Sequence, residues 1–298
     1  MMRVAAAALA LGMGLARGGA VVVMLGTGTP NPEPERSGPA VAVIVGSRAY
    51  VVDAGPGVVR RAAQAARLGF PQLESKGLTT LFLTHLHSDH TAGMPDFLLS
   101  PAVTGRTEGL EVYGPAGVAA MVRDLMRAYR VDLDIRLRRG WEPSIPAAYA
   151  MRTHEIRKDG VALKTADVQV EAFRVKHGAL RDSFGYRFTT PDGKSVVISG
   201  DTTLSENLMR YAQGCDILVH EVYSANALKR RTPEWRRYHA AFHTSAVDLG
   251  RIAARVKPRV LVLYHSLPFG DPPDQIVTEI RENYPGPLIF ASDLEVIR

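Results

Sequence analysis

Three histidines and an aspartate crowd into six consecutive positions of the stretch LFLTHLHSDHTAG, residues 81–93. They are His85, His87, Asp89 and His90, and they follow an apolar run that is typical of a buried strand. In an extended or tightly turned segment, residues two apart point the same way, so His85 and His87 can bind one ion together. Asp89 and His90 come around the next turn, where they can face a neighbouring ion. Neutral imidazole and carboxylate are ordinary ligands of zinc and other borderline divalent cations, so this stretch predicts a metal site.

A metal site needs further ligands, and three polar residues stand where later apolar strands stop. His177 follows VEAFRVK, Asp201 follows SVVISG, and His265 follows RVLVLY. Strand ends at one edge of a layered fold converge on one cleft. We therefore expect these three side chains to join the first cluster.

The rest of the chain reads as two β-rich halves, each running from strands to helices. In the first half we expect a strand and Gly-rich turn in VVVMLGTGTP, a hairpin turning at Gly46 and Ser47, and helices over 58–68 and 116–129. In the second half we expect strands over 168–175, 184–189, 195–201, 215–221 and 259–265, helices over 244–256 and 274–284, and a terminal strand pair within 288–298. The irregular segment 136–146 is expected to connect the halves. This order predicts the α/β (α+β) class and a four-layer αββα sandwich.

The composition suits one large domain or two tightly joined halves with a substantial core. The chain has 298 residues, of which 46% are hydrophobic and 22% are charged, so it is not a disordered chain. Its one cysteine, Cys215, excludes an internal disulfide. The fold is therefore held by its core and, we expect, by metal.

The N-terminal stretch MMRVAAAALALGMGLARGGA resembles a secretory signal peptide over residues 1–20, which leaves a domain over 21–298. Export would place that domain in the periplasm or outside the cell, and a retained stretch would place it in the cytoplasm. The alternative is a helical or frayed N-terminal extension, because cleavage after Ala20 would leave the first strand without a spacer. The stretch is too short and too rich in alanine and glycine for us to predict a membrane span.

The net charge of +6 is mild once the N-terminus is set aside. Without Arg3 and Arg17, 34 basic residues remain against 30 acidic ones, and the excess falls to +4. This excess suits an anionic substrate, but it gives no strong signal for a nucleic-acid partner.

The motifs HLHSDH, KHG, SGD and YHS, in this order, resemble those of the metallo-β-lactamase superfamily of dinuclear metal hydrolases. The resemblance extends over nearly the whole of residues 21–298. It implies the αββα metallo-β-lactamase fold and two divalent metal ions, most often zinc, although these ligand types also accept manganese or iron. It also suggests a homodimer.

The resemblance divides the seven candidate ligands into two sets with one residue between them. It implies that the first ion is held by His85, His87 and His177, the second by Asp89, His90 and His265, and that Asp201 bridges the two. A water-derived hydroxide would be the second bridge and the nucleophile, because two adjacent cations lower the pKa of bound water. Asp89 is also predicted to be catalytic.

Two further motifs resemble the ribonuclease Z and arylsulfatase-like branch of the superfamily. They are VHEVYS, which contains Glu221, and FHTSAVDLGRIA, in which His243 precedes a helix. The resemblance implies that Glu221 orients His243 and that His243 is the general acid that protonates the departing alkoxide. A phosphate or sulfate ester leaves poorly as a bare anion, and a positioned imidazole helps by roughly 10²–10⁴-fold.

Two departures from the tRNA-processing enzymes of this branch favour a smaller substrate. Only a hairpin separates His177 from Asp201, where the bacterial short form inserts a tRNA-gripping arm, and DAGPGVVRR at 53–61 departs from the expected Gly-Glu-Gly-Thr pattern. We therefore expect hydrolysis of a small anionic ester, either an aryl sulfate or a phosphodiester. The alternatives are an RNA 3′-processing endoribonuclease, a lactonase or thioesterase, and a non-catalytic metal-binding protein.

For several polar residues the sequence predicts no catalytic role. No site role is predicted for His154, His220 and His239. The basic stretch LKRRTPEWRRYH, residues 228–239, is interpreted either as a solvated face or as a mobile basic flap over the cleft.

Overall fold

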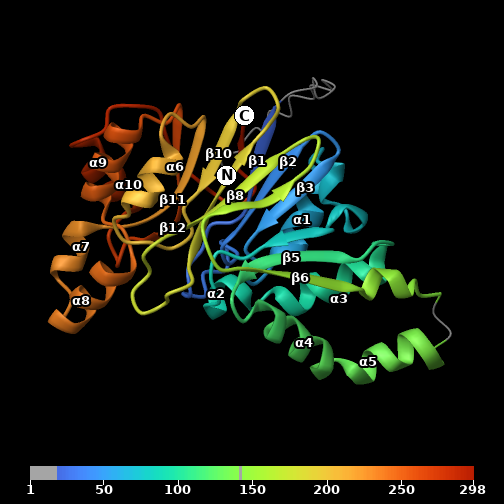
Figure 1. The fold of residues 1–298 in the computed structure, drawn as a ribbon. Helices are drawn as coiled ribbons and strands as arrows, with labels where there is room; N and C mark the ends of the chain where they lie inside the picture. Colours follow the sequence, from blue (N-terminus) through green and yellow to red (C-terminus); the bar gives the residue numbers. More distant parts are fainter. Residues whose placement is uncertain (1–18, 141–142) are drawn as a thin grey trace, which may run out of the picture.

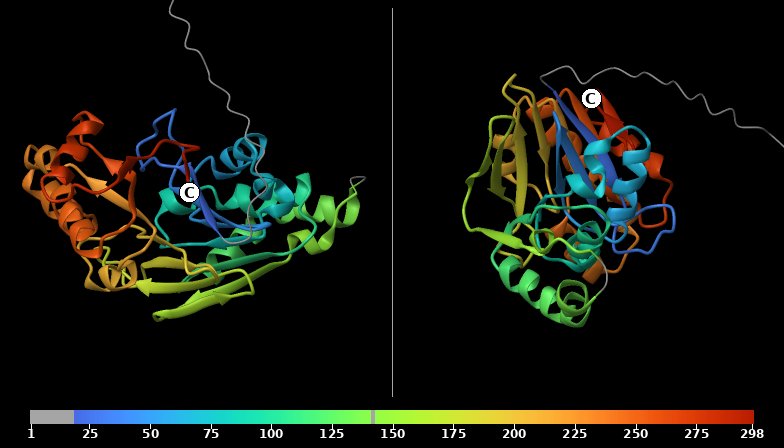
Figure 2. Two further views of the ribbon diagram at one scale, coloured as in Figure 1. Left: turned by 90° about the horizontal axis from the view of Figure 1, so that it is seen from above. Right: turned by 90° about the vertical axis from the view of Figure 1, so that its right-hand side faces the viewer.

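Two seven-stranded β-sheets lie face to face at the centre of the computed structural model, which describes residues 19–140 and 143–298 (Figure 1). The first sheet has the strand order β14-β1-β2-β3-β4-β5-β6, and the second has the order β13-β12-β11-β10-β9-β8-β7. Helices cover the outer face of each sheet, so the predicted αββα sandwich is confirmed. The orange-to-red helices lie on one side of the molecule and the blue-to-green helices on the other (Figure 2).

Both sheets draw most of their strands from one half of the chain. The strands of the first sheet are β1 (Ala20–Gly26), β2 (Ala40–Val45), β3 (Arg48–Val52), β4 (Thr80–Phe82), β5 (Leu110–Pro115), β6 (Met151–Ile156) and β14 (Val296–Ile297). The strands of the second sheet are β7 (Gly160–Lys164), β8 (Gln169–Arg174), β9 (Phe184–Thr189), β10 (Ser195–Ile198), β11 (Ile217–Tyr223), β12 (Val260–Leu267) and β13 (Leu288–Phe290).

The alternation of side chains along β1 shows why the layers form. Val21, Val23 and Leu25 join the core beneath the first helix layer. Val22 and Met24 point to the other face and join the core between the two sheets. Because successive residues of a strand face opposite sides, an all-apolar strand must be covered on both faces.

The helices that cover the sheets are amphipathic or apolar. The first sheet is covered by α1 (Val58–Arg67), α3 (Met94–Thr104) and α4 (Val118–Ala128), and the second by α6 (Glu206–Ala212), α9 (Ala246–Val256) and α10 (Pro273–Arg281). Shorter or more exposed helices are α2 (Ser88–Thr91), α5 (Arg130–Asp134), α7 (Ala225–Lys229) and α8 (Pro233–Phe242). Single turns lie at Pro71–Leu73, Ser75–Gly77, Ile135–Arg139 and Pro146–Tyr149.

The structure adds one helix to the sequence-based organisation and corrects two of its details. The added helix, α3, contains two prolines. Pro95 occupies the first turn, where its missing N–H has no helical partner to lose, and the carbonyl oxygen of Phe97, left free by Pro101, accepts from Arg106 Nη1 at 3.2 Å. Segment 136–146 is not irregular throughout, since a helical turn continues to Arg139. The two terminal strands do not pair with each other: β13 pairs with β12 and β14 pairs with β1, so the chain end ties the two sheets together.

The predicted signal peptide falls mainly on residues 1–18, which lie outside the described residues. Strand β1 begins at Ala20, within the predicted segment. In residues 19–140 and 143–298, every helix is too short or too polar to cross a membrane.

Candidate metal centre and active site

The carboxylate of Asp201 lies at the centre of a ring of imidazoles at one edge of the sandwich. Asp201 follows β10, and Gly200 before it adopts a left-handed conformation that turns the chain sharply into the site. The distances from an Asp201 carboxylate oxygen to the nearest ring nitrogen are 3.4 Å for His90, 3.5 Å for His265, 3.8 Å for His243, 3.9 Å for His177 and 4.0 Å for His85.

All seven side chains predicted to bind metal meet in this cluster. Ligand atoms of His85, His87 and His177 lie within 4.8 Å of one another. Those of a second set, Asp89, His90 and His265, do the same, and so do those of a third, His85, His90 and Asp201. His87 and Asp89 are partly exposed at the cleft, whereas the other five are buried. The structure therefore brings together the two sets that the family resemblance implies, with Asp201 between them.

Three of the histidines have one ring nitrogen engaged by a polar partner outside the cluster. His177 Nδ1 lies 2.7 Å from the carbonyl oxygen of Phe242, His90 Nδ1 lies 2.8 Å from Asp53 Oδ2, and His85 Nδ1 lies 2.9 Å from Thr84 Oγ1. A carbonyl or carboxylate oxygen only accepts, so Nδ1 of His177 and His90 donates, and in the neutral ring Nε2 keeps its lone pair. Such outer partners orient metal-binding imidazoles and fix their tautomer.

Burial and the neighbouring charges shift the pKa values of these groups in different directions. Burial lowers the pKa of His85 well below its usual value and lowers that of His177 to about 4, so both are neutral at pH 7. Burial opposes ionisation of Asp201, but His265 and His90 hold its pKa well below the usual range. Burial also disfavours the charged form of His90, but Asp201 and Asp53 together raise its pKa.

Unpartnered buried atoms show that this donor set fits a divalent metal. His85 Nε2, His90 Nε2, Asp201 Oδ1 and His265 Nδ1 have no hydrogen-bond partner among the described residues. A buried polar atom without a partner is costly, and a cation would satisfy several of these atoms at once. Histidine nitrogens with carboxylate oxygens form a set that zinc accepts.

Asp53 is a functional residue that the sequence analysis did not identify. It lies in the DAG turn after β3, is buried, and adopts a φ of 65°. Its carboxylate accepts from the backbone N–H of Thr84 at 2.8 Å and from His90 Nδ1. An aspartate directly after an apolar strand was the available signal. Asp53 thus holds both the loop that carries His85 and the ring of His90.

Replacing Asp53 by asparagine should weaken metal binding by about 10–100-fold while the chain stays folded. The amide is neutral, so it no longer favours the orientation of His90 that presents Nε2 to the centre. Zinc affinity measured by competition with a chromophoric chelator tests this expectation. Asp96→Asn, on the outer helix α3, is the matched control and should bind zinc as the wild type does. An affinity unchanged in Asp53→Asn would show that Asp53 does not position His90.

Glu221 and His243 form a buried pair beside the cluster. Glu221 lies on β11, and its Oε1 accepts backbone N–H groups of Thr244 at 2.8 Å and Thr202 at 3.3 Å. Its Oε2 lies 3.4 Å from His243 Nδ1. Burial raises the pKa of Glu221 well above its usual value and lowers that of His243 to about 4. Because burial disfavours net charge on the pair, the two groups together keep one proton, on either the carboxyl or the imidazole.

The three histidines that had no predicted role lie in three different environments. His154 is exposed at the edge of the first sheet and lies 2.7 Å from Glu111. His220 is buried on β11, where its Nδ1 donates to the carbonyl oxygen of Glu221 at 2.6 Å. His239 lines the cleft in front of the cluster, which the sequence analysis missed.

The buried His220 should make the protein less stable as the pH falls from 7 to 5. Burial lowers the pKa of His220 to about 4, against 6.5 for an unperturbed histidine. Between these values the unfolded chain binds a proton that the folded chain does not, so stability falls as pH falls, by about 2 kcal/mol between pH 7 and pH 5. Urea unfolding of the metal-free wild type and His220→Gln at both values measures the difference. If His220→Gln lost as much stability between pH 7 and pH 5 as the wild type, His220 would not be the cause of the loss.

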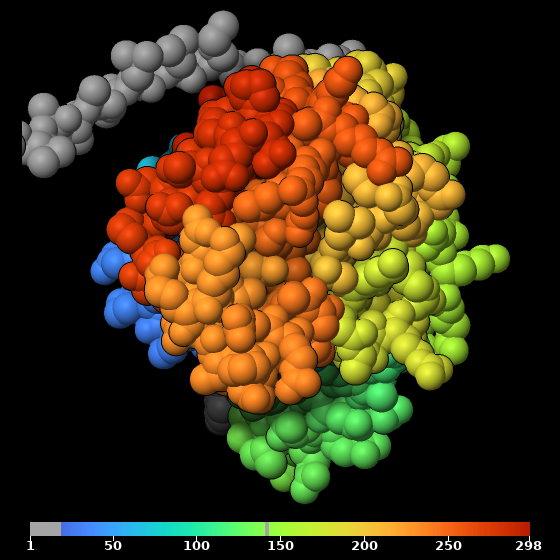
Figure 3. Space-filling model, turned by 90° about the vertical axis from the view of Figure 1, so that its left-hand side faces the viewer, coloured from blue at the N-terminus to red at the C-terminus, as the bar shows by residue number. Residues whose placement is uncertain are grey.

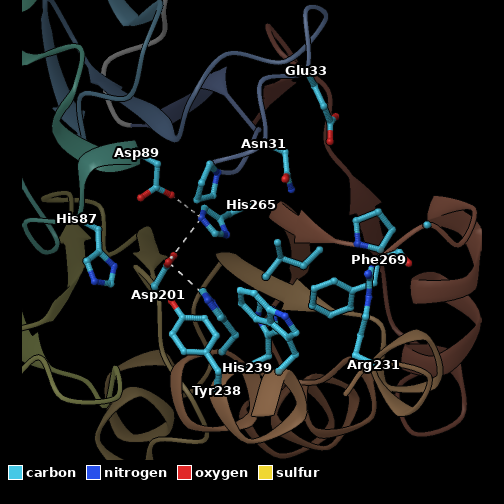
Figure 4. Close-up of a pocket in the computed structure, with 16 residues that line it drawn as sticks. Asn31, Glu33, His87, Asp89, Asp201, Arg231, Tyr238, His239, His265 and Phe269 are labelled. Atoms are coloured by element: carbon cyan, nitrogen blue, oxygen red, sulfur yellow. Dashed lines mark hydrogen bonds and ion pairs between the residues drawn. The ribbon is translucent and has the colours of Figure 1, made fainter. Parts of the chain in front are cut away.

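An open cleft of about 560 Å³ leads to the cluster. His87, Asp89, Asp201 and His265 lie at one end, Phe269 and Arg231 lie at the other, and Tyr238 and His239 lie along one side between them (Figure 4). The backbone of the LGTGTP turn also approaches the site, because Thr27 O accepts from the backbone N–H of His265 at 3.0 Å. The site can hold a cation, an anionic substrate and a proton donor side by side.

Comparison with known proteins identifies relatives along most of the chain. Residues 48–266 match the family described as the Beta-lactamase superfamily domain. The chain is 33% identical over 235 residues to "Ribonuclease Z" of Mycobacterium sp. (strain KMS), covering 78% of this chain and 79% of that protein. It is 32% identical over 242 residues to "Ribonuclease Z" of Mycobacterium bovis (strain BCG / Pasteur 1173P2), covering 78% and 81%.

Two solved structures share the fold at lower sequence identity. The metallo-beta-lactamase fold protein YhfI from Bacillus subtilis superposes with a TM-score of 0.71 at 17% identity, covering 94% of this chain and all of that one. Human tRNase Z, short form, superposes with a TM-score of 0.68 at 21% identity, covering 93% and 98%.

Proposed function

Because the chain belongs to the metallo-β-lactamase superfamily, in the branch that includes ribonuclease Z enzymes, we propose that it hydrolyses phosphodiester bonds. The observation that carries this proposal is the convergence of seven side chains around Asp201, beside an acid–base pair and an open cleft. Together these features supply a place for metal, a proton donor for a poor leaving group and room for the substrate.

The chain's own residues fit two adjacent divalent ions, which we propose to be zinc. His85, His87 and His177 would hold one ion, and Asp89, His90 and His265 the other. Asp201 would lie between them, where its negative charge offsets their mutual repulsion. Metal held in this way would lower the pKa of bound water, so that the water could act as the nucleophile.

His243 is placed to deliver the proton that the leaving oxygen needs. It lines the cleft, and Glu221 lies behind it on the buried side. Glu221 is itself fixed by two backbone N–H groups, and its free oxygen, 3.4 Å from His243 Nδ1, is placed to orient the imidazole. In our proposal the pair gives its single proton to the departing alkoxide and regains one when the next water enters. Asp89, which we also propose to be catalytic, lines the same cleft, and its Oδ2 lies 3.1 Å from His265 Nε2.

Two substrate classes contain the proposed bond. RNA, the substrate of a 3′-processing endoribonuclease, is favoured by the relatives named "Ribonuclease Z". A small phosphodiester is favoured by the segment between His177 and Asp201, which holds only β9, β10 and their connections. Aryl sulfates, lactones and thioesters remain predictions that no comparison supports. Periplasmic or secreted location and a homodimer also remain predictions.

A hydrolysis panel on the purified, metal-analysed protein tests the proposal. It should contain bis(4-nitrophenyl) phosphate, a pre-tRNA, 4-nitrophenyl sulfate, a lactone, a thioester and a β-lactam. We expect turnover of the phosphodiesters and loss of that turnover after chelation, with recovery on adding zinc. Preferred turnover of the sulfate, lactone or thioester would contradict the phosphodiester assignment. Cleavage of pre-tRNA at one position would select the RNA class.

A further inference from the structure

Helix α8 places large aromatic side chains at the surface instead of in the core. None of its ten residues is buried. Trp235 keeps 55% of its surface exposed and Tyr238 keeps 41%. The segment that contains α7 and α8 lies on the face of the molecule shown in Figure 3. Exposed tryptophan and tyrosine are unusual for a solvated helix face, and they are the side chains that recognition sites use.

These aromatic side chains belong to the wall of the cleft that leads to Asp201. Trp235, Tyr238 and His239 line it from α8, and Phe269 lines it from the loop after β12 (Figure 4). Phe269 has a φ of 52°, a conformation that a bulky side chain rarely adopts. Such strain persists where the surrounding structure holds a side chain in a required position, and here that position is inside the cleft.

The rings run in contact from the helix surface to the catalytic pair. Trp235 stacks on His239 with centroids 5.6 Å apart at 23°, and His239 lies 5.7 Å from His243. His239 also packs against Phe269 at 4.5 Å. Trp235 and Phe269 therefore each lie two ring contacts from the proton donor, and a ring bound against either would lie three contacts from it, within the same cleft.

A fixed positive charge accompanies the aromatic wall. The Arg231 guanidinium lies 5.5 Å from the centroid of Phe269 and donates to its carbonyl oxygen at 3.1 Å. Arg231 also lines the cleft. An arginine held against an aromatic ring offers both a stacking plane and attraction for an anion.

We propose that α8 and Phe269 form an aromatic subsite that stacks a planar ring of the substrate, either a nucleobase or an aryl group, next to the scissile bond. The proposal rests on the phosphodiesterase function for the ester that carries the ring. Residues 228–239 were interpreted either as a solvated face or as a basic flap over the cleft. The proposal favours the second interpretation, because a solvated face would not direct its aromatic side chains into the cleft.

Binding of ring-bearing and ringless phosphates to the full-length, zinc-loaded protein tests the subsite without turnover. The sequence has two tryptophans, so Trp141→Phe leaves Trp235 as the only one. In this variant, uridine monophosphate or phenyl phosphate should quench the tryptophan fluorescence. Ribose 5-phosphate and methyl phosphate should bind, as calorimetry can establish, without quenching it. Equal quenching by all four probes would overturn the proposal.

Substitution of Trp235 tests the energetic contribution of the ring contact. In Trp235→Ala, calorimetry should show about tenfold weaker binding of the two ring-bearing probes and unchanged binding of the ringless ones. Trp235→Phe should keep most of the affinity. Tyr129→Ala removes an aromatic residue of similar exposure at the end of α4 and is the matched control. Full affinity of Trp235→Ala for both ring-bearing probes would overturn the proposal.

The two ring-bearing probes show whether the bound ring is a nucleobase or an aryl group. If the subsite binds nucleobases, Trp235→Ala should weaken binding of uridine monophosphate more than binding of phenyl phosphate. Size-exclusion chromatography tests the competing explanation, that a second copy of the chain covers the exposed face of α8. Conversion of a dimer into a monomer by Trp235→Ala, with ring affinity unchanged, would assign α8 to an interface and overturn the subsite. A protein that shows ring-specific quenching but hydrolyses no phosphodiester would refute the proposed function while supporting the subsite.

Discussion

Replacing Asp201 by asparagine should remove bound metal and lower kcat/KM for phosphodiesters by at least about 10³-fold. The carboxylate of Asp201 lies within 4.0 Å of five imidazoles, and it is the one carboxylate shared by the sets on either side of it. Asparagine has nearly the same shape, so packing is preserved while the negative charge is lost. In the proposed centre the cluster would then have to hold two cations with one carboxylate fewer, at the point where their repulsion is greatest.

Metal content per chain, measured by elemental analysis alongside kcat/KM, checks this result. Asp192→Asn is the matched control, because Asp192 lies in the exposed turn between β9 and β10 and should leave both quantities unchanged. Near-normal turnover with full metal content in Asp201→Asn would mean that Asp201 is no metal ligand. The placement of the two ions would then have to be abandoned.

Replacing His243 by alanine should lower kcat by about 10²–10⁴-fold for esters with poor leaving groups, and by less than about tenfold for 4-nitrophenyl esters. An alkoxide needs a proton as it departs, whereas 4-nitrophenolate is stable without one. The variant removes the imidazole that faces the cleft and leaves Glu221 without its partner. A series of aryl phosphodiesters of increasing leaving-group pKa should therefore give a steeper fall in rate in the variant.

The leaving-group series also distinguishes proton donation from metal binding. His243 lies close enough to Asp201 and His177 to contribute to a metal set itself. An equal loss of kcat for every leaving group, together with reduced metal content, would assign His243 to the metal and contradict its role as general acid. The control is His154→Ala, at the exposed edge of the first sheet, which should change neither rate nor metal content.

Much of the candidate site could be predicted because its residues occupy recognisable positions in the sequence. The cluster from His85 to His90 follows directly after an apolar strand, and His177, Asp201 and His265 each follow another. The periodicity of the strands and helices predicted the layers in the same way. These signals lie within short segments, so they can be recognised in the sequence without knowledge of the fold.

Of the residues that were missed, Asp53 does follow an apolar strand, whereas His239 and Trp235 carry no local signal of that kind. Asp53 reads as a turn residue, and its role appears only because its carboxylate meets His90, 37 positions later. His239 and Trp235 lie in a basic stretch that reads equally well as a solvated face. The last two strands were expected to pair with each other, because neighbouring segments usually do.

The sequence alone determined which donor atoms are available, in which order, and on which kind of element, because residue type and periodicity are properties of short segments. The tertiary structure alone decided which atoms meet. It brings Asp89 to 3.1 Å from His265 across 176 positions, and His87 to 3.1 Å from His177 across 90. These distances follow from the pairing of strands and the packing of two sheets, which sum many weak contacts over the whole chain. For that reason no single motif contains them.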